Sequence, residues 1–137
     1  MTESNPLTRQ VAGSHYVKLA IQPMVFSAQH GYDSAAFSIL KYVTRWRDKN
    51  GVKDLEKAIH CAELRMTEEI RLHVGDINPP HYSPMDDYCT KNKLPPLESS
   101  ILIDLENWFF MPHGCGDSTF GAAVIRGIQQ LISENGG

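Results

Sequence analysis

The spacing of apolar residues constrains this chain more than any other feature. Between positions 52 and 74 the sequence places Leu55, Ile59, Ala62, Met66 and Ile70 at intervals of three and four residues. That spacing puts all five on one face of an α-helix. Runs of β-forming residues are short everywhere in the chain. The sequence therefore predicts an all-α fold, a small helical domain.

Helix start and stop residues divide the first half into three helices. Pro23 suits the first position of a helix, and Gly31 suits its end, which predicts a helix over about 23–30. Asp33 or Ser34 can cap a second helix, which runs to the Asn50–Gly51 turn. The third helix runs from about 52 to 74. Because the turn between the second and third helices is short, they should form an antiparallel pair.

Proline changes the character of the second half. Five prolines fall between residues 76 and 97, and they predict an irregular connector. Two further helices are expected, over 98–111 and about 119–133. The predicted organisation is therefore a flexible N-terminus (1–12), a helical core (13–75) that holds the candidate binding residues described below, a Pro-rich connector (76–97) and a C-terminal helical segment (98–137).

Length, charge and cysteine usage exclude several classes of protein. A chain of 137 residues is the size of one domain, and its net charge of −3 argues against binding to duplex nucleic acid through overall charge. No apolar run reaches the ~18 residues of a membrane helix, and the N-terminus lacks the pattern of a secretory signal. Three widely spaced cysteines fit reduced thiols in a cytoplasm.

Basic residues are concentrated between positions 41 and 57. Lys41 and Arg45 lie four apart, on one helical face, and Lys49 and Lys57 lie on either side of the Asn–Gly turn. Arginine and lysine are the side chains that bind phosphate oxygens, so the stretch is a candidate polyanion site. A solvated basic face, or a basic face that contacts other subunits of a helical oligomer, explains the same charges. Tyr42 and Trp46 could stack on a base or belong to the core.

A second cluster precedes the first predicted helix. Ser14 and His15 can contact phosphate, and the amide of Gln22 can pair with the edge of a base; a capped loop is the alternative explanation. The Gly-Lys-Ser/Thr core of a P-loop is missing, and the dispersed histidines and cysteines provide no metal-ligand set.

Several short motifs occur in a defined order between residues 10 and 65. They are His15-Tyr16, Ile21-Gln22-Pro23, Gly31, Lys41-Tyr42-Val43-Thr44-Arg45, Lys49-Asn50-Gly51, Asp54-Leu55 and Lys57-Ala58. This series resembles a family of small phage proteins, formerly of unknown function, that includes a deoxynucleotide kinase without a P-loop. The resemblance implies a homo-oligomer in the host cytoplasm that transfers a phosphoryl group from a nucleoside triphosphate to a deoxynucleoside monophosphate.

The resemblance also suggests roles for individual residues. It implies catalytic roles for His15, Lys41 and Arg45, and nucleotide contacts from Ser14, Tyr16, Gln22, Tyr42, Lys49, Asp54 and Lys57. Asp54 could hold an arginine or a metal, or cap its helix. The cofactor is left open, with Mg²⁺ accompanying the triphosphate as the candidate. A second hypothesis is a binding protein that sequesters a nucleotide, such as a host immune signal, without turnover.

Overall fold

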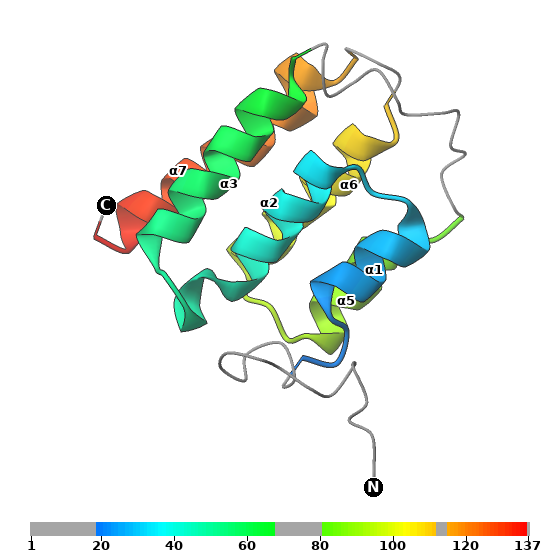
Figure 1. The fold of residues 1–137 in the computed structure, drawn as a ribbon, viewed down its shortest axis with the longest axis horizontal. Coiled ribbons are helices and arrows are strands. Elements are labelled where there is room, and N and C mark those ends of the chain that lie inside the picture. Colours follow the sequence, from blue (N-terminus) through cyan, green and yellow to red (C-terminus); the bar gives the residue numbers. More distant parts are fainter. Residues whose placement is uncertain (1–18, 68–80, 112–114, 137) are drawn as a thin grey trace, which may run out of the picture.

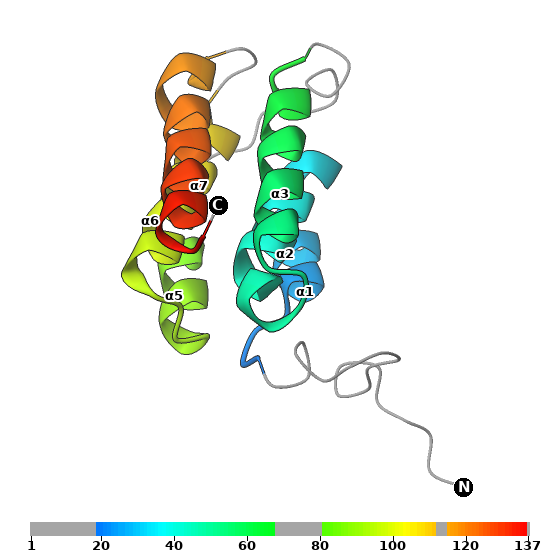
Figure 2. The same ribbon diagram turned by 90° about the vertical axis from the view of Figure 1, so that its left-hand side faces the viewer.

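The helices in the described part of the chain form two stacked layers of three. The computed structural model describes residues 19–67, 81–111 and 115–136. One layer holds α1 (Pro23–His30), α2 (Ser34–Arg45) and α3 (Val52–Arg65), and the other holds α5 (Pro84–Lys91), α6 (Pro96–Phe109) and α7 (Ala122–Glu134), as Figures 1 and 2 show. The described residues contain no strand, so the predicted all-α fold is confirmed.

The helices of the first layer begin where the sequence predicts. Pro23 is the first residue of α1, and Gly31 ends that helix with a φ of 70°, in the left-handed region that favours glycine. Asp33 caps α2, because its Oδ1 accepts a hydrogen bond of 2.8 Å from the amide of Ala36. The starts of these two helices are therefore set by local interactions that can be predicted from the sequence.

The turn between α2 and α3 differs from the prediction in its detail. The helix predicted to reach the Asn–Gly turn ends instead at Arg45, where the chain tightens into a 3₁₀ turn over Trp46–Asp48. Gly51 then has a φ of 61° and a ψ of −137°, a conformation that is open to glycine alone. The chain reverses there, and α2 and α3 pack antiparallel as expected (Figure 1).

Two predicted boundaries in the middle of the chain are wrong. The third helix ends at Arg65 rather than at 74, and residues 68–74 lie outside the described part of the chain. The predicted Pro-rich connector contains α5 and the start of α6. Pro84 and Pro96 each occupy the first position of a helix, where a missing N–H costs nothing. These prolines therefore start helices instead of preventing them.

The last predicted helix is also divided. A turn of π-helix over Asp117–Gly121 precedes α7, which begins at Ala122. Trp108 determines this arrangement, because its Nε1 donates a hydrogen bond of 2.9 Å to Asp117 Oδ1. Its ring also lies so close to Gly121 that a Cβ at that position would approach it to 2.9 Å.

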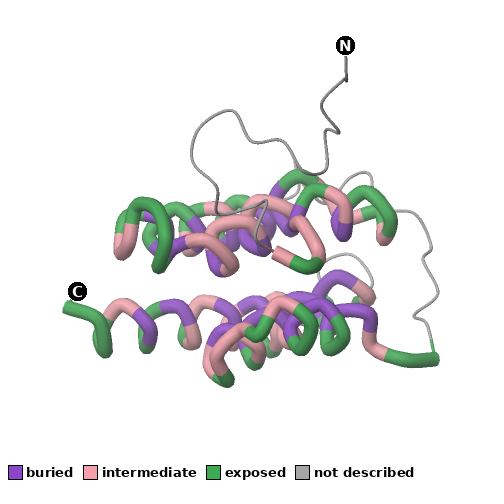
Figure 3. Tube along the Cα trace, turned by 90° about the horizontal axis from the view of Figure 1, so that it is seen from below, coloured by how far each residue is buried: buried purple, intermediate pink, exposed green. Residues whose placement is uncertain are grey.

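The core lies between the two layers. Figure 3 views the layers edge-on and shows the buried positions facing each other. Helix α2 packs on α6 and α3 packs on α7, while the rings of Phe26 in α1 and Tyr88 in α5 lie 4.9 Å apart. Buried polar residues also link the layers, since Glu98 of α6 accepts hydrogen bonds from Trp46 and Arg47. Within the described ranges, no helix is both long and apolar enough to span a membrane.

Candidate phosphate-binding site

A pocket of about 210 Å³ opens between the start of α1 and the face of α2 that carries Phe37, Lys41 and Arg45. Its described lining consists of Gln22, Pro23, Met24, Phe37, Lys41 and Arg45. Lys41 and Arg45 reach it from successive turns of α2, as their four-residue spacing requires. The pocket is smaller than the roughly 300 Å³ at which typical ligand pockets begin, and matches a phosphate group better than a whole nucleotide.

The start of α1 adds a further source of positive potential to the pocket. The first N–H groups of a helix have no partner within the helix, and the helix dipole makes this end positive. Gln22 precedes the helix and makes no side-chain capping hydrogen bond to it. Because Pro23 has no N–H, Met24 and Val25 supply the first donors. An anion in this pocket would meet a helix N-terminus and two cationic side chains together.

Asp54 holds Arg45 in place from behind the pocket. It lies in the first turn of α3 and is completely buried. Its Oδ2 accepts a hydrogen bond of 3.2 Å from Arg45 Nε, and its Oδ1 accepts one of 3.3 Å from the side-chain Nδ2 of Asn50. Because both oxygens are engaged and no part of the residue is exposed, Asp54 acts through Arg45 and does not face the pocket.

Three basic side chains lie around the ring of Tyr42. Lys41 Nζ lies 4.6 Å from its centre, the guanidinium carbon of Arg45 4.9 Å and Lys57 Nζ 5.8 Å. Cations at these distances are attracted to the ring face. These contacts favour a role for Tyr42 in positioning the basic side chains over a role in stacking on a base. Trp46 belongs to the core, since it is 5% exposed and bonded to Glu98.

The surroundings of Lys41 disfavour its positive charge. Its pKa is lowered from the ordinary lysine value, first by partial burial and then by the positive charge of Arg45, with a smaller effect of Lys57 in the same direction. Among the described residues no carboxylate forms an ion pair with Lys41. A bound anion would relieve both effects.

The predicted site residues fall into four groups. Gln22, Lys41 and Arg45 line the pocket, while Tyr42, Asp54 and Lys57 surround its two cations. Lys49 is exposed beyond the 3₁₀ turn and is not part of the described lining. The predicted residues Ser14, His15 and Tyr16 lie outside the described residues.

Sequence reasoning missed the contribution of α1 to this pocket. Met24 and Phe37 line it, and Asn50 helps to hold Asp54. The available signal was the pair Gln22–Pro23, which marks a helix start without a strong capping side chain. What the sequence did not reveal is that this helix start lies beside the C-terminal end of α2.

Comparison with known proteins gives a family match without a function. A family described as a protein of unknown function (DUF3310) matches residues 10–63. The matched stretch includes every described residue that lines the pocket, together with Asp54. No curated protein and no solved structure matches the chain.

Proposed function

We propose that this protein binds a deoxynucleotide through its phosphates at the Lys41 pocket, and that it transfers a phosphoryl group from a nucleoside triphosphate to a deoxynucleoside monophosphate. One observation carries the proposal. Lys41, Arg45 and the start of α1 converge on one pocket whose described lining contains no carboxylate. The transfer itself rests on the motif series between residues 10 and 65, which resembles that of a phage deoxynucleotide kinase without a P-loop.

The proposed reaction asks little of the protein beyond charge and position. A phosphate oxygen of the monophosphate attacks the γ-phosphorus of the donor, and the bond from that phosphorus to the departing diphosphate breaks. The attacking phosphate is largely ionised at neutral pH, so no general base is needed. Lys41 and Arg45 offset the negative charge that gathers as the two phosphates meet. Asp54 acts as a positioning residue by fixing Arg45.

The described residues do not fit a metal ion held by the protein. They contain no group of carboxylate, histidine and cysteine side chains that could hold one, and Asp54 is already bonded to Arg45 and Asn50. We propose that Mg²⁺ accompanies the nucleoside triphosphate. Following the resemblance, we place His15 against a phosphate and Ser14, Tyr16, Gln22 and Lys49 around the nucleotide, in a homo-oligomer in the host cytoplasm.

Binding without turnover is the second candidate function. It needs only the anion-binding groups of the described lining and a pocket of about 210 Å³, which matches a single phosphate group. Such a protein would sequester a nucleotide, for example a signal of host immunity, and would release it unchanged.

One experiment separates the two candidates. Purified protein is incubated with each labelled deoxynucleoside monophosphate and with ATP, with and without magnesium, and the products and bound nucleotides are separated by chromatography. Labelled diphosphate that disappears in Lys41→Ala supports the kinase. Nucleotide that binds and is recovered unchanged supports sequestration. The matched control is Lys93→Ala, which removes an exposed lysine between α5 and α6 that is not among the described lining of either pocket. Absence of both products and binding overturns the proposal.

A further inference from the structure

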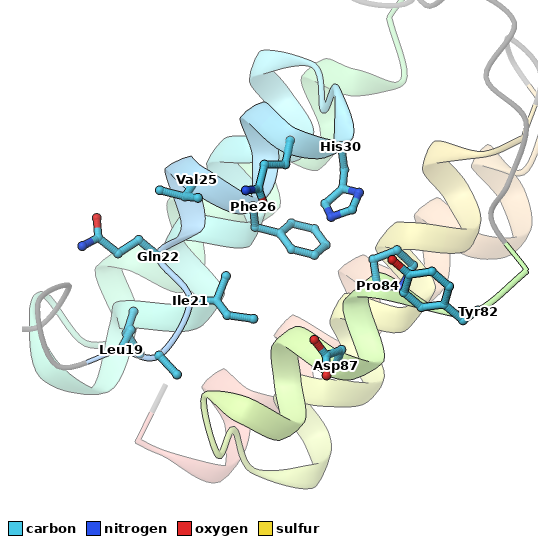
Figure 4. Close-up of a pocket in the computed structure, with 11 residues that line it drawn as sticks. Leu19, Ile21, Gln22, Val25, Phe26, His30, Tyr82, Pro84 and Asp87 are labelled. Carbon is cyan, nitrogen blue, oxygen red and sulfur yellow. The ribbon is translucent and has the colours of Figure 1, made fainter. Parts of the chain in front are cut away.

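A larger cleft separates the start of the first layer from the start of the second. It measures about 710 Å³ and lies between α1 and α5 (Figure 4). Its described lining comes from two segments, residues 19–30 and residues 82–87. The volume falls within the roughly 300–1,000 Å³ of pockets that hold small organic molecules. It is more than three times the volume of the Lys41 pocket.

The cleft is fixed open by contacts between its walls. At one end the side chain of Asn92, just after α5, makes two hydrogen bonds of 2.8 Å to the backbone of Ile21: one donated to the carbonyl and one accepted from the amide. Further along, the rings of Phe26 and Tyr88 meet at 4.9 Å. These contacts hold α1 at a set distance from α5, so the space exists before any ligand enters.

The chemistry of the walls favours a flat molecule that carries N–H donors. On the α1 side, the ring centres of Phe26 and His30 lie 4.5 Å apart, and Figure 4 shows both rings directed toward α5. On the α5 side lie Tyr82, which is 68% exposed, and Asp87, whose Oδ2 also pairs with Lys91 Nζ at 3.2 Å on the exposed face of α5. Aromatic side chains offer stacking surfaces, and a carboxylate accepts hydrogen bonds from N–H groups while repelling phosphate.

The cleft and the Lys41 pocket share one residue, since Gln22 lines both. The two spaces also divide by charge, with cations around the smaller one and a carboxylate in the larger one. We propose that the α1–α5 cleft receives the base of the nucleotide whose phosphate occupies the Lys41 pocket. This assignment rests on the proposed function. It identifies Asp87 as a hydrogen-bond acceptor for base N–H groups, with Tyr82 and His30 as neighbouring rings.

The test measures the two parts of the nucleotide separately. Calorimetry gives the affinities of the four unphosphorylated deoxynucleosides and of pyrophosphate for the full chain and its variants. Asp87→Asn removes the acceptor charge, and Asp86→Asn is the matched control because Asp86 is a neighbouring exposed residue of α5 that does not line the cleft. At least one deoxynucleoside should bind about tenfold more weakly to Asp87→Asn, as expected for the loss of a charged hydrogen bond.

The pattern across ligands decides the outcome. The proposal requires that Asp87→Asn leave pyrophosphate affinity unchanged, and that Lys41→Ala weaken pyrophosphate but not the deoxynucleoside. Equal effects of Asp87→Asn and Asp86→Asn on every deoxynucleoside would overturn the base site, as would the absence of deoxynucleoside binding. If pyrophosphate still binds in a Lys41-dependent way, the phosphate site stands and only the base site falls. If pyrophosphate does not bind, the proposed function fails instead.

Discussion

Replacing Asp54 by Asn should destabilise the protein strongly although the side chain keeps its size. The substitution removes the negative charge that Arg45 contacts at 3.2 Å, while the Arg45 side chain remains only 12% exposed. Removing one partner of a buried ion pair costs about 3–5 kcal/mol, and the residual exposure of Arg45 favours the lower end. For a chain of this size we expect a free energy of unfolding lower by about 3 kcal/mol and a melting temperature lower by about 10 °C.

Urea denaturation followed by far-UV circular dichroism measures this effect. Asp87→Asn serves as the control, because its pair with Lys91 is more than half exposed on the lysine side and should be worth less than about 1 kcal/mol. Adding Arg45→Met to Asp54→Asn should recover part of the loss by removing the charge that Asp54 no longer offsets. A loss below about 1 kcal/mol in Asp54→Asn would refute the buried ion pair as the element that holds Arg45.

Three further predictions test the site and the packing. Lys41→Met should abolish pyrophosphate binding yet change the free energy of unfolding at neutral pH by less than about 1 kcal/mol, because the end of partial charge burial and of repulsion from Arg45 opposes the lost attraction to the Tyr42 ring. Because the pKa of Lys41 is lowered on folding, wild-type stability should gain from this group between that pKa and the ordinary lysine value, a rise absent from Lys41→Met. Gly127→Ala should lose about 1–3 kcal/mol in urea denaturation despite alanine's helix propensity, because its Cβ would lie 2.5 Å from Ile101 Cγ1. Burial raises the pKa of Cys89 to about 11, so mass spectrometry should find the buried Cys89 thiol alkylated more slowly than the exposed Cys115 thiol at pH 7.5.

The starts of the first two helices could be predicted from sequence because the interactions that set them are local. Pro23, Gly31 and Asp33 act through backbone groups within four residues of themselves, and the structure places each where it was expected. The prolines between residues 76 and 97 led to a wrong prediction. A proline breaks a helix only in the helix interior, whereas Pro84 and Pro96 are each the first residue of a helix. Nothing in the local sequence distinguishes these two cases.

The candidate site was predictable in its residues but not in its geometry. Spacing alone put Lys41 and Arg45 on one face of α2. Two facts required the tertiary structure: α1 presents its N-terminus to those cations, and Asp54 turns inward to Arg45. The α1–α5 cleft could not be predicted from sequence for the same reason, because it depends on a contact between Asn92 and the backbone of Ile21, 71 residues away.

Titration of ¹⁵N-labelled protein with pyrophosphate tests the phosphate site most directly, because backbone amides report where the anion sits. The account predicts that the largest chemical-shift changes occur at the amides of Met24 and Val25 and that they vanish in Lys41→Ala. Saturable shifts confined to another part of the chain, or identical shifts in Lys41→Ala, would contradict it.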